Sequence, residues 1–267
     1  MAGLFCRERN AMLRDDLTIV SQREIAPDIY ELKLSGLMVG LMGIGQFLHM
    51  KVPDASMLLR RPISISQVDK EANVATLIYR VEGQGTAVFA QMQPGQTIDC
   101  MGPQGHGFEI DGLKAGQTAL LIGGGIGVPP LVELAKQLAA KGVQVQSVIG
   151  FATKSAVILE DELAQYGSVT VTTDDGSYGI KGYVSTIVEG LEWPDAVYAC
   201  GAPGMLRYVD KIFEDHPQAY ISIEARMACG MGACYACVVP VKNGRADEYV
   251  RVCEEGPVFA TGQLVLD

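Results

Sequence analysis

The chain has 267 residues, of which 48% are hydrophobic and 19% charged, and its formal net charge is −10. This composition supports a large buried core and argues against disorder, and the length suits two domains better than one. No run of Lys or Arg stands out, so we expect no surface that follows nucleic-acid phosphates.

The sequence predicts neither a signal peptide nor a membrane-spanning segment. Residues 1–16 carry charges of both signs without a long apolar segment, so we expect no signal peptide there. The longest apolar stretch, residues 37–50, is rich in glycine and interrupted by Gln46 and His49. It predicts a buried strand with its turn and no membrane span.

Residues 17–100 contain short runs with alternating or β-branched residues, separated by Gly, Pro and Asp. Many short strands at this spacing predict an antiparallel β-barrel. From about residue 117 the pattern changes to apolar strands that alternate with helical segments, which we expect over 129–142, 155–167, 182–191 and 204–216. Repeated β-then-α order predicts a doubly wound parallel sheet. The cysteine-rich segment follows.

A glycine-rich turn, GGGIGVPP, joins the first apolar strand to its helix. Gly123, Gly124, Gly125 and Gly127 would let backbone N–H groups approach a dinucleotide phosphate at the helix start. The fingerprint is incomplete because Val128 stands where its last glycine would be, so a plain tight turn is the alternative. The next strand ends in Thr153, Lys154 and Ser155 without an acidic residue, which leaves NAD and NADP both open.

Cys200 ends a later strand of the same predicted sheet, in the sequence YACGAPGM. The carboxyl ends of parallel strands border the ligand crevice, so Cys200 could face a nicotinamide. The alternative is a buried small hydrophobic residue, which is the usual role of a free cysteine.

Two arginine-containing stretches lie in the barrel half. In RRPISIS, residues 60–66, an arginine could hold a diphosphate and Ser64 could donate to a flavin edge. In YRVEGQGT, residues 79–86, another arginine precedes a glycine turn and a hydroxyl, which is a second candidate diphosphate clamp. An exposed arginine pair and a hairpin turn are the respective alternatives.

The most specific motif is the spacing C-x4-C-x2-C-x15-C of Cys229, Cys234, Cys237 and Cys253. Its first part is the plant-type [2Fe–2S] spacing, whereas zinc sites usually begin with C-x2-C. Seven cysteines, an odd number, without an export signal favour a reducing cytoplasm, where clustered cysteines indicate metal more than disulfides. We therefore expect an iron–sulfur site, with zinc as the alternative.

The predicted dinucleotide site and the predicted iron–sulfur site exchange electrons in different numbers. A nicotinamide exchanges two electrons as a hydride, whereas a [2Fe–2S] cluster transfers one electron at a time. A flavin can do both. A cluster together with a dinucleotide site therefore predicts a flavin, and the barrel with its two arginine-containing turns is where we expect it.

The chain resembles the ferredoxin-reductase superfamily and, within it, the electron-transfer subunits of NAD-dependent (class 1B) dihydroorotate dehydrogenase. The stretches RPISI, GQGT, GPQGHGF, GGGIGVPPL, TDDGSYGIKGYV, CGAPGM and EARMACGMGACYAC occur in the family's order and span nearly the whole chain. The cysteine segment and DDGSYGIKG are the most specific, while GGGIGVPPL is common to the superfamily.

The resemblance implies three bound groups: FAD, a [2Fe–2S] cluster and NAD. The residues that match the family's flavin-binding stretches are Arg61, Pro62, Ile63, Ser64, Ile78, Tyr79, Arg80, Gly85 and Thr86. The four late cysteines match the cluster ligands. In the wider superfamily an aromatic residue often occupies the position of Ile63 and stacks on the flavin.

The resemblance also implies a partner, an FMN-containing subunit that oxidises dihydroorotate, in a heterotetramer of de novo pyrimidine biosynthesis. We therefore assign no catalytic base to this chain and place the interface around residues 229–237. Other reductases of the superfamily, such as an NAD(P)H:ferredoxin oxidoreductase or a sulfhydrogenase subunit, are the alternatives, and a non-enzymatic zinc module is the alternative from another class.

The expected division has an FAD-binding barrel at 1–112, an NAD-binding α/β domain at 113–223 and a cluster-binding module at 224–267. Only 38 residues follow Cys229, too few for a complete fused ferredoxin domain.

Overall fold

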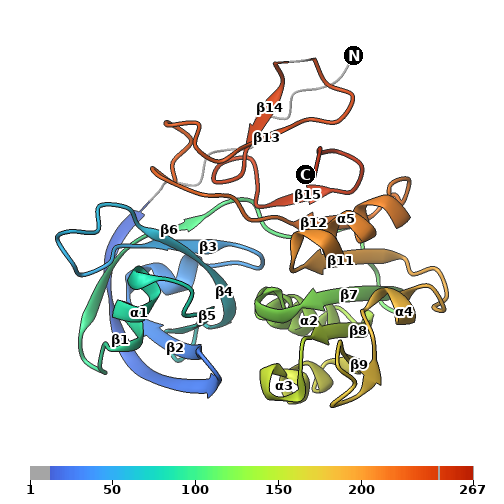
Figure 1. Ribbon diagram of the computed structural model, residues 1–267, viewed down its shortest axis with the longest axis horizontal. Helices are drawn as coiled ribbons and strands as arrows, with labels where there is room; N and C mark the ends of the chain where they lie inside the picture. Colours follow the sequence, from blue (N-terminus) through green and yellow to red (C-terminus); the bar gives the residue numbers. More distant parts are fainter. Residues whose placement is uncertain (1–12, 246, 267) are drawn as a thin grey trace.

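The computed structural model describes residues 13–245 and 247–266 and has three adjoining parts (Figure 1). The expected absence of a signal peptide concerns residues that lie largely outside this description. The barrel is closed, with strand order β1-β2-β5-β4-β3-β6 and antiparallel pairing throughout. Its elements are β1 (Leu13–Ala26), β2 (Ile29–Ser35), η1 (Leu37–Leu41), β3 (Phe47–Met50), β4 (Arg61–Asp69), β5 (Val74–Arg80), α1 (Gln84–Ala90) and β6 (Thr97–Gln104).

The barrel closes because alternate residues of its strands fill one apolar interior. Leu17 and Ile19 of β1 and Leu32 and Leu34 of β2 are buried in this interior together with Tyr79 of β5. A period of two is what a strand with one buried face requires. The antiparallel barrel predicted from the short β-runs is therefore confirmed. In the apolar stretch 37–50, a short 3₁₀ helix precedes the buried strand β3.

The second part is a seven-stranded sheet in the order β10-β9-β8-β7-β11-β12-β15. All of its pairs are parallel except β12–β15. Its strands are β7 (Thr118–Gly124), β8 (Gln144–Phe151), β9 (Gly167–Thr173), β10 (Ile180–Lys181), β11 (Ala196–Cys200), β12 (Ala219–Ser222) and β15 (Val258–Ala260). Its helices are η2 (Gly125–Gly127), α2 (Pro130–Ala140), η3 (Lys154–Ala156), α3 (Glu160–Ala164), α4 (Ser185–Val188) and α5 (Pro203–Ile212). The predicted parallel sheet is confirmed.

The third part carries the cysteines and a two-stranded ribbon, β13 (Val238–Pro240) and β14 (Tyr249–Arg251). Its last strand, β15, pairs with β12 and so extends the main sheet (Figure 1). One apolar cluster contains Phe47 of the barrel, Ile221 of the sheet, and Cys237, Cys253 and Phe259 of this part. Because they share this core, the three parts pack as one body, and the domain boundaries at 112/113 and 223/224 stay a prediction.

Helix α2 docks the sheet onto the barrel through buried polar contacts with β4. The Val68 N–H donates to the Glu133 carboxylate at 3.0 Å, and the Ser66 hydroxyl donates to the Pro129 carbonyl at 3.0 Å. Glu133 is buried, so the Val68 N–H satisfies a carboxylate that would otherwise be costly to bury. Strand β4 is thereby fixed against the glycine turn at the start of α2.

In the part of the chain that the structure describes, no helix has the length and apolar character needed to span a membrane.

Candidate functional site: a flavin face, a dinucleotide cleft and a cysteine loop

The first predicted flavin stretch forms the start of β4. Arg61, Pro62, Ile63 and Ser64 are all half-buried there, on a strand that pairs with β3. Arg61 lies across the first turn of α1, because a methyl group at Gly85 would stand 2.6 Å from the arginine Nε. Only glycine lets the guanidinium approach the helix start this closely. The structure thus brings Arg61 and Gly85 together as one cationic corner.

The second predicted stretch, at the end of β5, is presented mainly through its backbone. Ile78 and Tyr79 are almost fully buried, and the Tyr79 hydroxyl donates to the Gln22 amide oxygen at 3.1 Å inside the barrel. Their side chains therefore belong to the core. Arg80 instead reaches the Gly125 turn, where a methyl group would stand 3.3 Å from its Nη2.

The stretch GQGT forms the first turn of α1, where a hairpin turn was the alternative. The Thr86 hydroxyl accepts hydrogen bonds from the N–H groups of Glu82 and Gly83, at 3.1 and 3.3 Å. This hydroxyl therefore holds the start of its own helix, which is a capping role that the sequence motif did not reveal.

A cavity of about 980 Å³ opens between the glycine turn, the end of β11 and the barrel. Gly124, Gly125 and Gly127 line it together with Arg80 and residues 201–206. Gly127 is required by the fold, because a methyl group there would stand 2.4 Å from the Cys200 carbonyl carbon. The cavity has the size and the glycine wall expected of a dinucleotide site.

Two of the predicted dinucleotide residues lie just behind this wall. Gly123 packs against Val128 and Ile149. Cys200 is buried in the core, and burial raises the pKa of its thiol to about 12. The thiol is therefore protonated at neutral pH, and only the backbone of Cys200 borders the adjoining turn.

Two carboxylates that the sequence analysis did not assign also line the cavity, Asp174 after β9 and Glu224 after β12. Glu224 is exposed to the cavity, but neighbouring protein atoms exclude much of the water around it. This desolvation raises the pKa of its carboxyl, and the negative charge of Glu82 raises it further, while Arg80 lowers it. Each follows a strand of the parallel sheet, which is the one signal in the sequence that could have identified them.

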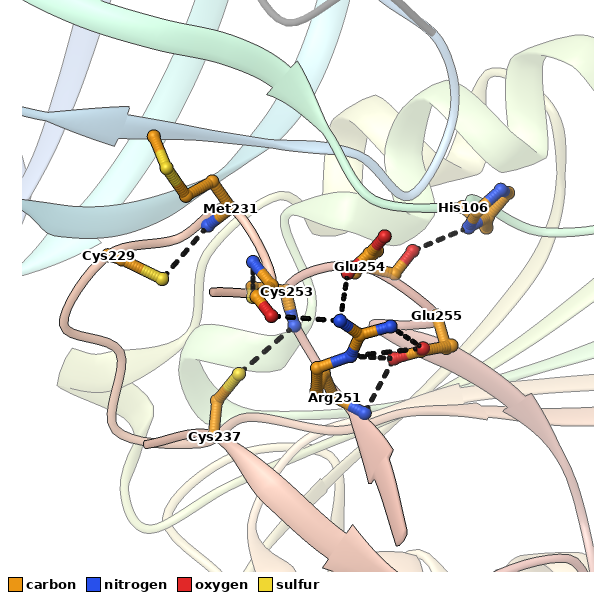
Figure 2. Close-up of polar contacts among 9 residues, drawn as sticks. His106, Cys229, Met231, Cys237, Arg251, Cys253, Glu254 and Glu255 are labelled. Atoms are coloured by element: carbon orange, nitrogen blue, oxygen red, sulfur yellow. Dashed lines mark hydrogen bonds and ion pairs between the residues drawn. The ribbon is translucent and has the colours of Figure 1, made fainter. Parts of the chain in front are cut away.

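Figure 2 shows three of the four predicted ligand cysteines, Cys229 and Cys237 of one segment and Cys253 of a neighbouring one; Cys234 is exposed in the first segment. The thiols of Cys229 and Cys234 lie near enough to influence each other's ionisation, and so do those of Cys237 and Cys253. Three backbone N–H groups point at these sulfurs. Met231 donates to Cys229 at 3.4 Å, Gly232 to Cys253 at 3.2 Å, and Cys253 to Cys237 at 3.5 Å.

This arrangement fits a two-iron cluster, in which each iron takes two thiolates and backbone N–H groups point at sulfur. Partial burial opposes ionisation of Cys229, but backbone hydrogen bonds from Met231 and its neighbours lower the pKa of this thiol to about 7. Burial raises the pKa of Cys253 to about 12, and metal binding displaces such protons.

The loop that carries the ligands is held by glycines and by one arginine. Gly230 and Gly232 have φ values of 68° and 74°, in the left-handed region that favours glycine. The Arg251 guanidinium donates to the Gly232 carbonyl at 2.8 Å and pairs with Glu254 at 2.7 Å and with Glu255 (Figure 2). Arg251 therefore ties the first cysteine segment to the segment around Cys253, a role that no spacing rule predicts.

A flavin-binding barrel, a parallel-sheet dinucleotide domain and a [2Fe–2S]-type cysteine loop packed together in one chain define an iron–sulfur flavoprotein reductase of the ferredoxin-reductase type. Residues 16–108 match the family "Oxidoreductase FAD-binding domain". Residues 224–265 match "Iron-sulfur cluster binding domain of dihydroorotate dehydrogenase B".

Comparison with similar proteins identifies the family within this class of reductases. The "Dihydroorotate dehydrogenase B (NAD(+)), electron transfer subunit" of Streptococcus thermophilus is 67% identical over 96% of this chain and 100% of its own length. The protein of the same name from Geobacillus thermodenitrificans is 52% identical, over 95% and 99%. The chain belongs to the family of dihydroorotate dehydrogenase B electron transfer subunits.

Among solved structures, an NADH-dependent reduced ferredoxin-NADP oxidoreductase matches with a TM-score of 0.83 at 28% identity, over 94% of this chain and 90% of that one. A ferredoxin NADP+ reductase from Neisseria gonorrhoeae matches with a TM-score of 0.64 at 17% identity, over 76% and 92%. The second likeness shows the fold alone.

Proposed function

We propose that this chain carries electrons from the FMN of a dihydroorotate dehydrogenase subunit, through a [2Fe–2S] cluster and FAD, to NAD⁺ in pyrimidine (UMP) biosynthesis. The observation that carries the proposal is the placement of the cysteine loop against the barrel beside the flavin stretch, with the glycine-walled cavity next to it. Relatives that share more than half of their residues with this chain bear the corresponding name.

A bound flavin supplies the exchange between two-electron and one-electron chemistry. For the chain itself we propose that Arg61 and the start of α1 hold the FAD diphosphate, since a guanidinium provides a bidentate donor for phosphate. Ser64 donates to the flavin edge, and the backbone of Ile78 and Tyr79 lines the ring. Pro62 and Ile63 complete the strand that supports it.

For the nicotinamide dinucleotide we propose the cavity walled by Gly124, Gly125 and Gly127. Arg80 stands between the two sites, since it lines this cavity from the end of a flavin-binding strand. Gly123 and Cys200 support the wall from behind. The acid–base chemistry on dihydroorotate belongs to the partner subunit, so no residue of this chain is assigned to it.

We also propose that the surface around residues 229–237 docks the partner in a heterotetramer, in the reducing cytoplasm. Met231 and Tyr235 expose large apolar side chains there, and Cys234 is exposed between them. A cluster must lie close to the partner's flavin for rapid electron transfer, and this loop brings Cys234 to the surface, with Cys229 half-buried beside it.

The docking surface is tested with Met231→Arg, since Met231 is 47% exposed, and with Val20→Arg on β1 as a matched control at 46%. We expect Met231→Arg to weaken co-purification with the FMN subunit at least tenfold and Val20→Arg to leave it unchanged. Equal complex formation by both variants would remove the 229–237 surface from the proposal.

The function is tested on the full chain under anaerobic conditions. NADH should bleach the flavin absorbance and then produce the electron paramagnetic resonance (EPR) signal of a reduced [2Fe–2S] cluster. Dihydroorotate should produce the same two changes only when the FMN subunit is present. A colourless protein that contains zinc without iron would contradict the proposal, and reduction by ferredoxin alone would favour the alternative reductase.

A further inference from the structure

His49 is a fully buried histidine that has no ordinary structural role in the barrel. Its side chain is 0% exposed, and neither ring nitrogen has a hydrogen-bond partner among the described residues. A buried polar group without a partner costs about 1–3 kcal/mol. A buried imidazole that makes no bond within its own barrel therefore calls for an explanation elsewhere.

The position of His49 connects the flavin stretch to the cysteine loop. On β3 it pairs with Pro62 of the flavin-binding strand β4 and with Met101 of β6. Its ring faces Gly230, where a methyl group would stand 2.2 Å from Nδ1. Because any side chain at position 230 would strike the ring, the loop rests directly on the imidazole.

The neighbouring ligand offers the acceptor that the ring lacks. Two backbone carbonyls lie beside the imidazole, that of Arg60 in the barrel and that of Cys229 in the cysteine loop, and both favour its N–H, although neither reaches hydrogen-bond geometry. Of the two, only the Cys229 carbonyl belongs to a predicted ligand. An imidazole carries at least one N–H in either protonation state. A small movement of the loop as it closes around a cluster would complete the bond, and such outer hydrogen bonds orient ligands and tune iron–sulfur potentials.

We propose that His49 is a positioning residue of the iron–sulfur site, whose ring N–H is donated to the Cys229 carbonyl in the cluster-loaded protein. The inference rests on the proposed function and adds a barrel residue to the cluster's surroundings. The bond fixes the first ligand, and the positive end of the N–H dipole lies near the charge that the cluster gains on reduction. His49 therefore raises the reduction potential of the cluster.

The test compares His49→Leu, which removes the donor, with His49→Asn, whose amide N–H lies near the position of Nδ1. In the purified complex with FAD bound, we expect His49→Leu to shift the EPR g-values of the reduced cluster and to move its midpoint potential to a more negative value. His49→Asn should restore both toward wild type. Wild-type spectrum and potential in His49→Leu, or equal shifts in both variants, would overturn the inference.

A second measurement, on protein that keeps His49, covers the case in which the His49 variants fail to fold. With ¹⁵N-labelled histidine, pulsed EPR of the reduced wild-type complex should show a weak ¹⁵N coupling. The coupling should persist in His106→Asn, where the replaced ring contacts the Glu254 carbonyl at 2.8 Å. A cluster signal without such coupling would overturn the role of His49 alone, whereas a wild-type protein without any cluster signal would overturn the proposed function as well.

Discussion

Two adjacent arginines, Arg60 and Arg61, have different surroundings. The Arg60 guanidinium is held by hydrogen bonds within the protein, since it donates to the Asp99 carboxylate at 2.7 Å and to the Asp99 carbonyl at 2.8 Å. Arg61 makes no ion pair among the described residues and lies over Gly85 at the start of α1. The first is therefore available for stability and the second for a ligand.

Arg61→Met and Arg60→Met should separate these roles. Loss of a charge-assisted phosphate contact costs about 1.5–3 kcal/mol, so Arg61→Met should weaken FAD binding by about 10- to 100-fold. Fluorescence titration of the flavin measures this. Arg60→Met should bind FAD with an affinity close to that of wild type. It should lose about 2 kcal/mol of stability, because it removes the nearest partner of the half-buried Asp99 carboxylate. The reverse pattern would exchange the two assignments.

The Arg60 pair also gives a pH dependence. Burial alone would raise the pKa of Asp99, but hydrogen bonds from Arg60 and Arg14 lower it below its ordinary value of 3.8. A lowered carboxyl pKa contributes stability that is present above that ordinary value and is lost as the pH falls through the folded-state pKa. In urea unfolding followed by circular dichroism, the stability gap between wild type and Arg60→Met should shrink below pH 3.8. A gap that widens with acid would contradict this assignment.

At this scale the sequence identifies residues whose chemistry depends on spacing along the chain. The spacing of Cys229, Cys234, Cys237 and Cys253 predicts the cysteine loop that the structure forms. Glu224, Arg251 and His49 could not be predicted, because each acts through contacts with segments that are remote in sequence or through tertiary packing. Their assignment as ligands or supports stays a proposal.

At the scale of elements, apolar patterns predict the strands well and the short helices poorly. Residues 155–167 were expected to form one helix, but the structure has η3 and then α3 from Glu160. Leu159 interrupts the helix with a φ of 63°, and three acidic residues then occupy the first turn of α3, where the helix dipole favours them. Local periodicity cannot show a left-handed residue of this kind.

The glycine turn of the dinucleotide cleft is tested by Gly127→Ala. The added methyl group would meet the backbone of Cys200 at 2.4 Å, and the strand β11 cannot move without disturbing the sheet. We expect a loss of about 1–3 kcal/mol of stability and weaker NADH binding. Gly40→Ala, where the methyl group meets nothing within 4 Å, is the control and should behave as wild type. Equal NADH affinity in both variants would contradict a role of this turn in the cleft.

At the scale of the whole molecule, the cysteine-bearing part is built into the sheet. Phe259 of β15 packs in the core shared with Phe47 and Ile221, close to Cys237 and Cys253. Phe259→Ala should therefore cost about 3 kcal/mol and also lower the iron content. Thermal unfolding and iron analysis measure this, with the exposed Tyr249→Ala as the control. Destabilisation without iron loss would show that the cysteine loop folds independently.

The sequence pattern could not predict that the cysteine-bearing part joins the main sheet. The joining strand, β15, is only three residues long, and it pairs with β12 from the opposite end of the cysteine segment. The three-part architecture, by contrast, follows from strands and helices with strong periodicity. The order of the parts along the chain could therefore be predicted, while their common core could not.

The central claim is that electrons pass between dihydroorotate and NAD⁺ through the cysteine loop of this chain. The most direct test is the rate of dihydroorotate-dependent NAD⁺ reduction by the complex with the FMN subunit, for wild type, Cys234→Ser and the barrel variant Cys100→Ala. We predict activity in wild type and Cys100→Ala, and at least a hundredfold loss in Cys234→Ser that keeps its FAD. Undiminished activity in a Cys234→Ser complex without the cluster, or NAD⁺ reduction only with another electron donor, would contradict the account.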